Sequence, residues 1–241
     1  MLPPAGYIAI RCGLDVASVF KPDSPIFFNY PNIPQAQKTD GTTESVPLVA
    51  QGLAANVAEM VAYTCQPEYQ PLPDSALEIR SRILRHNYCV YLDILLQFCW
   101  SYGVGVVYFS RFPQNVEKIA GMVGYFYDRP AIVLSAKQFF SAELLFILAH
   151  QLRHLTFSLR DCESGTIIAD KKVECAARTL RDRDSGDNVE ADANTYAYEL
   201  LLGKSDIRYQ APRHCNAIGL ADLAIKSGKR DGVDPGTMSP G

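Results

Sequence analysis

The sequence "AELLFILAHQLRHLTFSL", residues 142–159, decides how this chain is interpreted. It is an apolar stretch long enough for a buried helix, and it carries His150 and His154 four residues apart. Residues at this spacing share one face of a helix, so both imidazoles can reach one tetrahedral metal ion. The next residue after the first histidine is Gln151, where an H-E-x-x-H motif has glutamate. The stretch predicts a metal-binding helix that lacks its usual acidic residue.

The pair of histidines does not by itself distinguish a metal site from two ordinary helix histidines. The chain contains four histidines, so two of them can fall four residues apart by chance. The sequence on either side of the helix has to decide between the two interpretations.

Composition predicts an ordinary globular protein. The chain has 241 residues, of which 48% are hydrophobic, enough for a substantial core. Its net charge of −3 comes without a basic stripe, which argues against nucleic-acid binding. It shows no export signal and no membrane span, so we expect a cytoplasmic location. The seven cysteines lack C-x-x-C spacing, so we expect reduced and mostly buried thiols.

The chain divides into an arm, a body and a tail. Residues 1–46 are rich in proline and asparagine without a sustained period, which predicts an irregular arm with one short strand. Residues 47–227 carry helical and strand patterns and form the predicted domain. Residues 228–241 are rich in glycine, proline and serine, which predicts a flexible tail.

The body is predicted to be α+β, a helical bundle with a small antiparallel or mixed sheet beside the histidine helix. Apolar periodicity predicts the helices, and β-branched and aromatic residues predict the strands. The predicted helices are 48–65, 75–86, 88–102, 141–158, 188–202 and 216–226. The predicted strands are 104–109 and two within 121–135, joined by an Asp-Arg-Pro turn, while 160–187 is predicted to be a polar segment.

The sequence around the histidines resembles the ImmA/IrrE family of metallopeptidases. In that family a strand leads to an F-x-x-A-H-E-x-G-H helix, and a later helix reads E-x-x-A-N-x-F/Y-A-x-x-L-L. The resemblance covers roughly residues 50–203 and is most specific in "VEADANTYAYELLLG", residues 189–203. The matching residues are Phe146, Ala149, His150, His154, Glu190, Ala193, Asn194, Tyr196, Ala197, Leu200 and Leu201.

The resemblance implies a zincin-like fold in which His150, His154 and Glu190 bind Zn²⁺. Asn194 follows Glu190 by one helical turn, so its amide is expected to hydrogen-bond a ligand. Two further residues are candidate donors to charge that develops during catalysis, namely Tyr198 and His214. Their alternatives are a core tyrosine and a surface histidine.

The third ligand has a rival in Glu174, which also lies in an E-x-x-A context. Its alternative is a solvent-exposed helix face, because the Asn and the Leu-Leu pair of the Glu190 helix are missing there. Cys162 and Cys175 flank the polar segment, and ligation by them would make a closed structural site.

Two residues depart from the family pattern. Gln151 has no basic lone pair at neutral pH and cannot take the proton of an attacking water. Either the chain is a substituted form of a glutamate-containing enzyme, which we favour, or it is naturally inactive. Arg153 replaces a glycine, and we expect it either at the rim of a cleft, facing an acidic substrate group, or in solvent.

These observations predict a zinc-dependent endopeptidase impaired by Gln151. The resemblance implies a specific protein substrate, such as a helix-turn-helix transcriptional repressor cleaved during stress. The alternatives are a non-catalytic binding module and a toxin or effector of the same fold. We expect the substrate to pair with the strand at Ile132, Val133, Leu134 and Ser135, or with 121–127 as second choice. The oligomeric state is not indicated.

Overall fold

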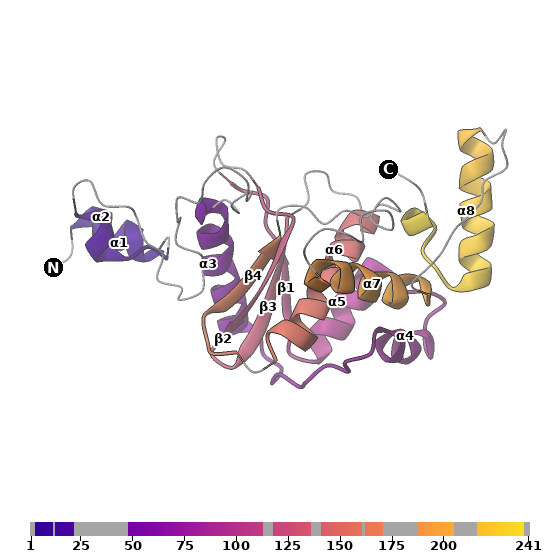
Figure 1. Ribbon diagram of the computed structural model, residues 1–241, viewed down its shortest axis with the longest axis horizontal. Helices are drawn as coiled ribbons and strands as arrows, with labels where there is room; N and C mark the ends of the chain where they lie inside the picture. Colours follow the sequence, from indigo (N-terminus) through magenta and orange to yellow (C-terminus); the bar gives the residue numbers. More distant parts are fainter. Residues whose placement is uncertain are drawn as a thin grey trace.

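A four-stranded sheet with helices on both faces forms the centre of the molecule (Figure 1). The computed structural model describes residues 3–11, 13–21, 48–112, 118–135, 141–160, 162–170, 188–204 and 216–238. Within these residues the fold is mixed α+β with a small sheet, as the sequence predicted. No helix among them is long and apolar enough to cross a membrane.

The sheet is mixed, with strand order β1-β3-β2-β4. Strand β3 pairs in parallel with β1 and antiparallel with β2, and β2 pairs antiparallel with β4. The strands are β1 Gly105–Tyr108, β2 Gly121–Phe126, β3 Arg129–Leu134 and β4 Thr166–Asp170. Strand β4 lies within the segment that was predicted to be polar and without regular structure. That prediction was wrong because the strand has five residues and polar flanks, too little for a clear period.

The predicted hairpin between β2 and β3 is confirmed, but it turns at Tyr127 and Asp128, so that only Asp128 of the predicted Asp-Arg-Pro turn lies in the loop. Phe126 pairs with Arg129, so the loop has two residues, and both have positive φ (52° and 60°). This is the backbone of a type I′ turn, whose twist matches that of the flanking strands. Arg129 begins β3 and is therefore outside the turn.

Alternate residues of β3 face two different layers. Ala131 and Val133 belong to the core beneath helix α3, Leu48–Thr64, whereas Ile132 and Leu134 belong to the core beneath the helices of the opposite face. Five alanines of α3 are fully buried against the sheet: Ala50, Ala54, Ala55, Ala58 and Ala62. Small side chains allow this helix to approach the strands closely.

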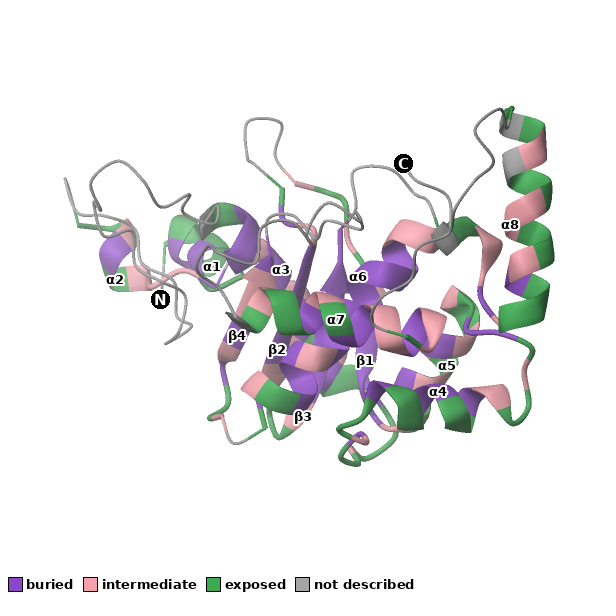
Figure 2. Ribbon diagram, turned by 45° about the vertical axis from the view of Figure 1, so that its right-hand side comes forward, coloured by how far each residue is buried: buried purple, intermediate pink, exposed green. Residues whose placement is uncertain are grey.

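The opposite face of the sheet is covered by α6, Ser141–Arg153, with α5, Leu92–Ser101, and α7, Asn188–Leu202, around it. Residues 144–152 of α6 are all buried, and Figure 2 shows α6 largely in the purple of buried residues. Helix α4, Ala76–Leu84, packs on α7. Because α6 is enclosed on every side, polar residues on it must find partners within the protein.

The two ends of the chain differ from the sequence predictions. The described part of the arm contains helices α1, Pro4–Arg11, and α2, Val16–Val19, where one short strand was predicted. Residues 22–47 lie outside the described residues. Helix α8, Ala217–Asp231, continues past the predicted end at 226 and into the predicted tail. It ends at Gly232, whose φ of 65° suits a glycine C-cap, and a 3₁₀ turn follows at Pro235–Met238.

The thiols that the structure describes are unpaired, as expected. Cys65, Cys89 and Cys99 are buried and Cys162 is partly buried. Burial raises the pKa of the Cys99 thiol to about 12, so this group stays protonated and unreactive. The other three cysteines, at 12, 175 and 215, lie outside the described residues.

Arg80 of α4 joins the ends of two other helices. Its guanidinium donates to the carbonyls of Leu200 (3.2 Å) and Leu201 (2.6 Å) in the last turn of α7. It also donates to the carbonyls of Asp231 (3.1 Å) and Gly232 (2.8 Å) at the end of α8. The last carbonyls of a helix have no partner within the helix, and a cation there also interacts favourably with the helix dipole.

We expect Arg80→Met to lower the free energy of unfolding by roughly 2–4 kcal/mol, because the buried carbonyls lose a charged donor. Urea denaturation followed by circular dichroism measures the change. Arg82→Met is the matched control, since Arg82 is an exposed arginine of the same helix, and it should change the midpoint little. Equal effects of the two substitutions would contradict a helix-joining role for Arg80.

Candidate metal centre

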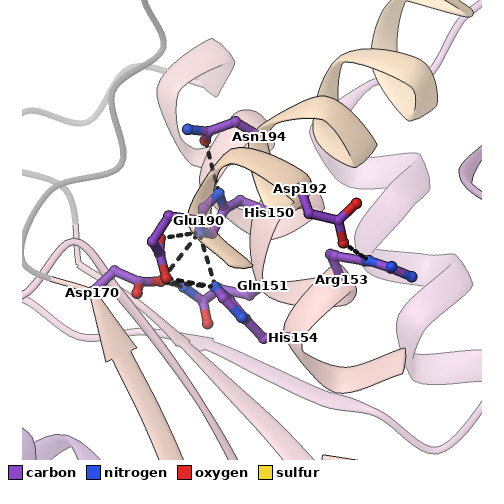
Figure 3. Close-up of polar contacts among 8 residues, drawn as sticks. All are labelled: His150, Gln151, Arg153, His154, Asp170, Glu190, Asp192 and Asn194. Atoms are coloured by element: carbon purple, nitrogen blue, oxygen red, sulfur yellow. Dashed lines mark hydrogen bonds and ion pairs between the residues drawn. The ribbon is translucent and has the colours of Figure 1, made fainter. Parts of the chain in front are cut away.

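Four side chains from four elements converge on one point (Figure 3). His150 lies in α6, His154 directly follows it, Asp170 ends β4, and Glu190 lies in the first turn of α7. One nitrogen or carboxylate oxygen from each of the four lies within 4.8 Å of the others. The two imidazoles and Asp170 are buried, while the Glu190 side chain is 43% exposed. The cluster is thus internal but reaches the surface beside α7.

The histidine helix changes its winding between the two predicted ligands. Helix α6 ends at Arg153, and His154–Ser158 forms a π-helix, where the sequence predicted one continuous helix. Wider turns of this kind are rare and are frequently found at functional sites. The two rings meet edge to face, at an interplanar angle of 67°, and the i, i+4 spacing brings their Nε2 atoms to 3.0 Å from each other.

Most separations within the cluster are close to those around a four-coordinate metal ion, although the two histidine Nε2 atoms, at 3.0 Å, are nearer than two ligands would be. Ligands at about 2.0–2.2 Å from a tetrahedral centre are roughly 3.3–3.6 Å from one another. The His150 Nε2 atom lies 3.4 Å from Asp170 Oδ2 and 3.3 Å from Glu190 Oε2. The His154 Nε2 atom lies 3.7 Å from Asp170 Oδ2 and 3.5 Å from Glu190 Oε1. These four groups could hold a metal ion.

Asn194 fixes which nitrogen of His150 faces the cluster. Its Oδ1 atom lies 2.9 Å from His150 Nδ1. An amide oxygen only accepts, so His150 Nδ1 donates the hydrogen and Nε2 is left for the cluster. The sequence predicted this contact from the position of Asn194 one turn after Glu190. It is the kind of contact that orients a metal-binding imidazole.

The charges of the cluster are strongly coupled. Burial acts to lower the pKa of His150, but hydrogen bonds to Asp170 and Glu190 outweigh it and raise the pKa to about 9. Burial lowers the pKa of His154, and the neighbouring His150 lowers it further against the pull of Asp170. Burial acts to raise the pKa of Asp170, but His150, His154 and Gln151 bring it below its usual value. The raised pKa of His150 and the lowered pKa of Asp170 both show that the cluster favours a positive charge beside the Asp170 carboxylate, a place that a cation can take.

Gln151 lies in the same cluster and binds one of its carboxylates. The side chain is fully buried, and its Nε2 atom donates to Asp170 Oδ2 (Figure 3). Its Oε1 atom is buried and has no hydrogen-bond partner among the residues described, and the same holds for His154 Nδ1. The amide at the position of the expected glutamate therefore contacts a site residue that the sequence did not predict.

Asp170 is the functional candidate that sequence reasoning missed. The signal for it was weak: it ends the short β-branched stretch "TIIAD" inside a polar segment. Strand pairing brings it beside Gly121 of β2, next to the histidine helix. No local pattern predicts such a pairing between distant segments.

The predicted substrate strand is wrong. Strand β3 lies between β1 and β2, so its backbone is paired on both sides, and residues 131–135 are buried. The misplaced residues are Ile132, Val133, Leu134 and Ser135. The second choice, 121–127, fails for the same reason because β2 lies between β3 and β4. Among the described strands the edges of the sheet are β1 and β4.

Arg153 is not available at a cleft rim. It forms an ion pair with Asp192 of α7, with 2.5 Å between Nε and Oδ2, and its guanidinium lies 4.4 Å from the centre of the Phe157 ring. Only 19% of its side chain is exposed. It therefore links the histidine helix to the helix of Glu190 (Figure 3).

Of the other candidates, Tyr198 packs in the core and does not join the cluster. Its ring centre lies 5.1 Å from that of Phe146, in agreement with the core alternative. The Cys162 thiol donates to the carbonyl of Ser158 and is not part of the cluster. The remaining candidates lie outside the described residues: Glu174, Cys175 and His214.

No protein-family model matches this chain, and no curated protein gives a significant match. The resemblance to ImmA/IrrE peptidases therefore stays a prediction from the sequence motifs. The geometry of the cluster is the main support for a function.

We expect Glu190→Ala to lose most of its bound zinc during dialysis, because it removes a ligand. The affinity should fall by more than the roughly 10–100-fold that loss of an outer hydrogen-bond partner costs. Glu174→Ala is the control and should keep its metal. The opposite pattern of metal contents would move the third ligand to Glu174 and contradict the assignment.

Proposed function

We propose that this protein is a zinc-dependent hydrolase of the metallopeptidase type, similar to the ImmA/IrrE family and acting on a peptide bond of a protein substrate. The observation that carries the proposal is the convergence of His150, His154 and Glu190 on one point from two packed helices. Their spacing agrees with the motifs from which the resemblance was inferred. A zincin-like fold is part of the proposal.

The donor set supports zinc as the metal. Two imidazole nitrogens and a carboxylate oxygen are a common ligand set of catalytic zinc sites. When bound, zinc polarises the carbonyl of the scissile bond and lowers the pKa of a water molecule. Asn194 orients His150 for this role, and the ion pair between Arg153 and Asp192 keeps the two ligand-bearing helices together.

Gln151 limits hydrolysis in this proposal. A carboxylate at that position would take a proton from the attacking water and pass it to the leaving amine. An amide cannot do so at neutral pH. Positioned acid–base groups contribute typically about 10²–10⁴-fold to the rate, so this chain should bind metal but turn over slowly.

Strand β4 is the edge that suits an extended substrate segment. It pairs with β2 on one side, and no described strand pairs with its other side. Its last residue is Asp170, so a peptide aligned along it would reach the cluster directly. Main-chain hydrogen bonds would supply affinity, and side-chain contacts would supply specificity. The resemblance favours a transcriptional repressor as the substrate protein.

A non-catalytic binding module is the second candidate function, and one observation favours it. Asp170 lies as close to both histidine Nε2 atoms as a fourth ligand would. Four protein ligands leave no position for water, which is typical of structural zinc sites. The two candidates differ in whether activity appears when a glutamate replaces Gln151.

We expect the Gln151→Glu variant to gain zinc-dependent proteolysis, about 10²–10⁴-fold above this chain. Cleavage of a diverse peptide library, with labelling of the new amino termini, measures the gain over many sequences at once. The double variant with His150→Ala is the control and should be inactive. A Gln151→Glu variant that is fully loaded with zinc and cuts nothing would favour the binding module.

A further inference from the structure

The Asp170 residue is held in place by contacts with its side chain and with its backbone. Its Oδ2 atom faces the Nε2 atoms of His150 and His154 and accepts a hydrogen bond from Gln151 Nε2. Its backbone carbonyl accepts a hydrogen bond of 2.7 Å from Ala120 N. The residue is buried together with its three side-chain partners.

We propose that Gln151 is a positioning residue that holds Asp170 in the fourth coordination position of the metal, so that this chain has a closed site of four protein ligands. The proposal rests on the metal binding at His150, His154 and Glu190 that the proposed function assumes, and a site closed by a fourth ligand is the arrangement of its second candidate, the binding module. In this proposal Gln151 does more than replace the general base, because it also holds a metal ligand in place.

The geometry indicates that Asp170 would bind the metal directly and would not act as a hydrogen-bond partner of a ligating histidine. An outer carboxylate accepts from the imidazole nitrogen that is not bound to metal. In His150 that nitrogen is Nδ1, and Asn194 already occupies it. Asp170 faces Nε2 of both rings, at 3.4 Å, within the range expected between ligands of one ion, and at 3.7 Å, slightly beyond it.

The amide of Gln151 suits this role and a carboxylate would not. It offers an N–H to a ligand that can only accept when ionised. A glutamate would put a second carboxylate against Asp170 inside the protein, where like charges repel strongly. The same substitution would thus drive Asp170 from the metal and supply a base. Residue 151 would therefore determine whether Asp170 occupies the fourth coordination position of the metal or leaves it open.

Gly121 provides the room for this arrangement. It pairs with Asp170 across β2 and β4, beneath the Gln151 side chain. A Cβ atom at Gly121 would lie 2.9 Å from Gln151 Nε2 and 2.7 Å from Ile147 Cγ2. Any larger residue would displace the amide that holds Asp170. The sheet and the histidine helix are therefore shaped to bring Gln151 and Asp170 into contact.

Cobalt(II) in place of zinc, with azide as a probe ligand, tests whether the site is closed. The visible spectrum of protein-bound cobalt changes when an added anion enters its coordination sphere. We expect azide to leave the spectrum of the unmodified protein unchanged. The Asp170→Ala variant should bind cobalt more weakly, by more than the roughly 10–100-fold that loss of an outer partner costs, and its spectrum should shift with azide. Asp222→Asn, which alters an exposed acid of α8 outside the cluster, should behave like the unmodified protein.

The Gln151→Leu variant provides a second test, because it removes the hydrogen bond and keeps the Asp170 side chain. Its spectrum should also become sensitive to azide. An unmodified protein whose cobalt spectrum shifts with azide as in Asp170→Ala would overturn the closed site while leaving metal binding intact. A protein that binds no cobalt, in the unmodified form and in Asp222→Asn, would overturn both the closed site and the proposed function.

Discussion

The constraint on which the rest of this structure depends is electrostatic. His150, His154 and Asp170 are buried around one point, and Glu190 joins them from its half-exposed position. Carboxylates and imidazole lone pairs gathered in this way repel one another unless a proton or a cation lies between them. Hydrogen bonds to Asp170 and Glu190 raise the pKa of His150, and a proton on this imidazole reduces the repulsion. A divalent cation would reduce the repulsion further.

The surrounding fold keeps these groups from relaxing apart. Helix α6 is enclosed by the sheet and by neighbouring helices, so its histidines cannot turn towards solvent. Arg153 links α6 to the first turns of α7 through Asp192, and Arg80 binds the carbonyls at the other end of α7. The helix that carries Glu190 is thus held at both ends. Strand pairing holds Asp170 in the same way.

Local sequence patterns predicted the parts of the site that lie on helices. The spacing of His150 and His154 and that of Glu190 and Asn194 are properties of single helices, and their apolar neighbours mark the buried faces. Asp170 and the edge strand were missed because strand order depends on pairing between segments distant in the chain. The contact that Gln151 makes was missed for the same reason: its partner lies on another element. Arg80 was equally hidden, since its acceptors are backbone carbonyls of α7 and α8.

The most direct test of the metal centre is anomalous diffraction at the zinc edge from crystals of the zinc-loaded protein. We expect one strong peak about 2.0–2.2 Å from Nε2 of His150 and His154 and from carboxylate oxygens of Glu190 and Asp170. Gln151 should still donate to Asp170 in that structure. The absence of a peak at these residues, in crystals that hold zinc elsewhere or not at all, would contradict a metal centre at this cluster.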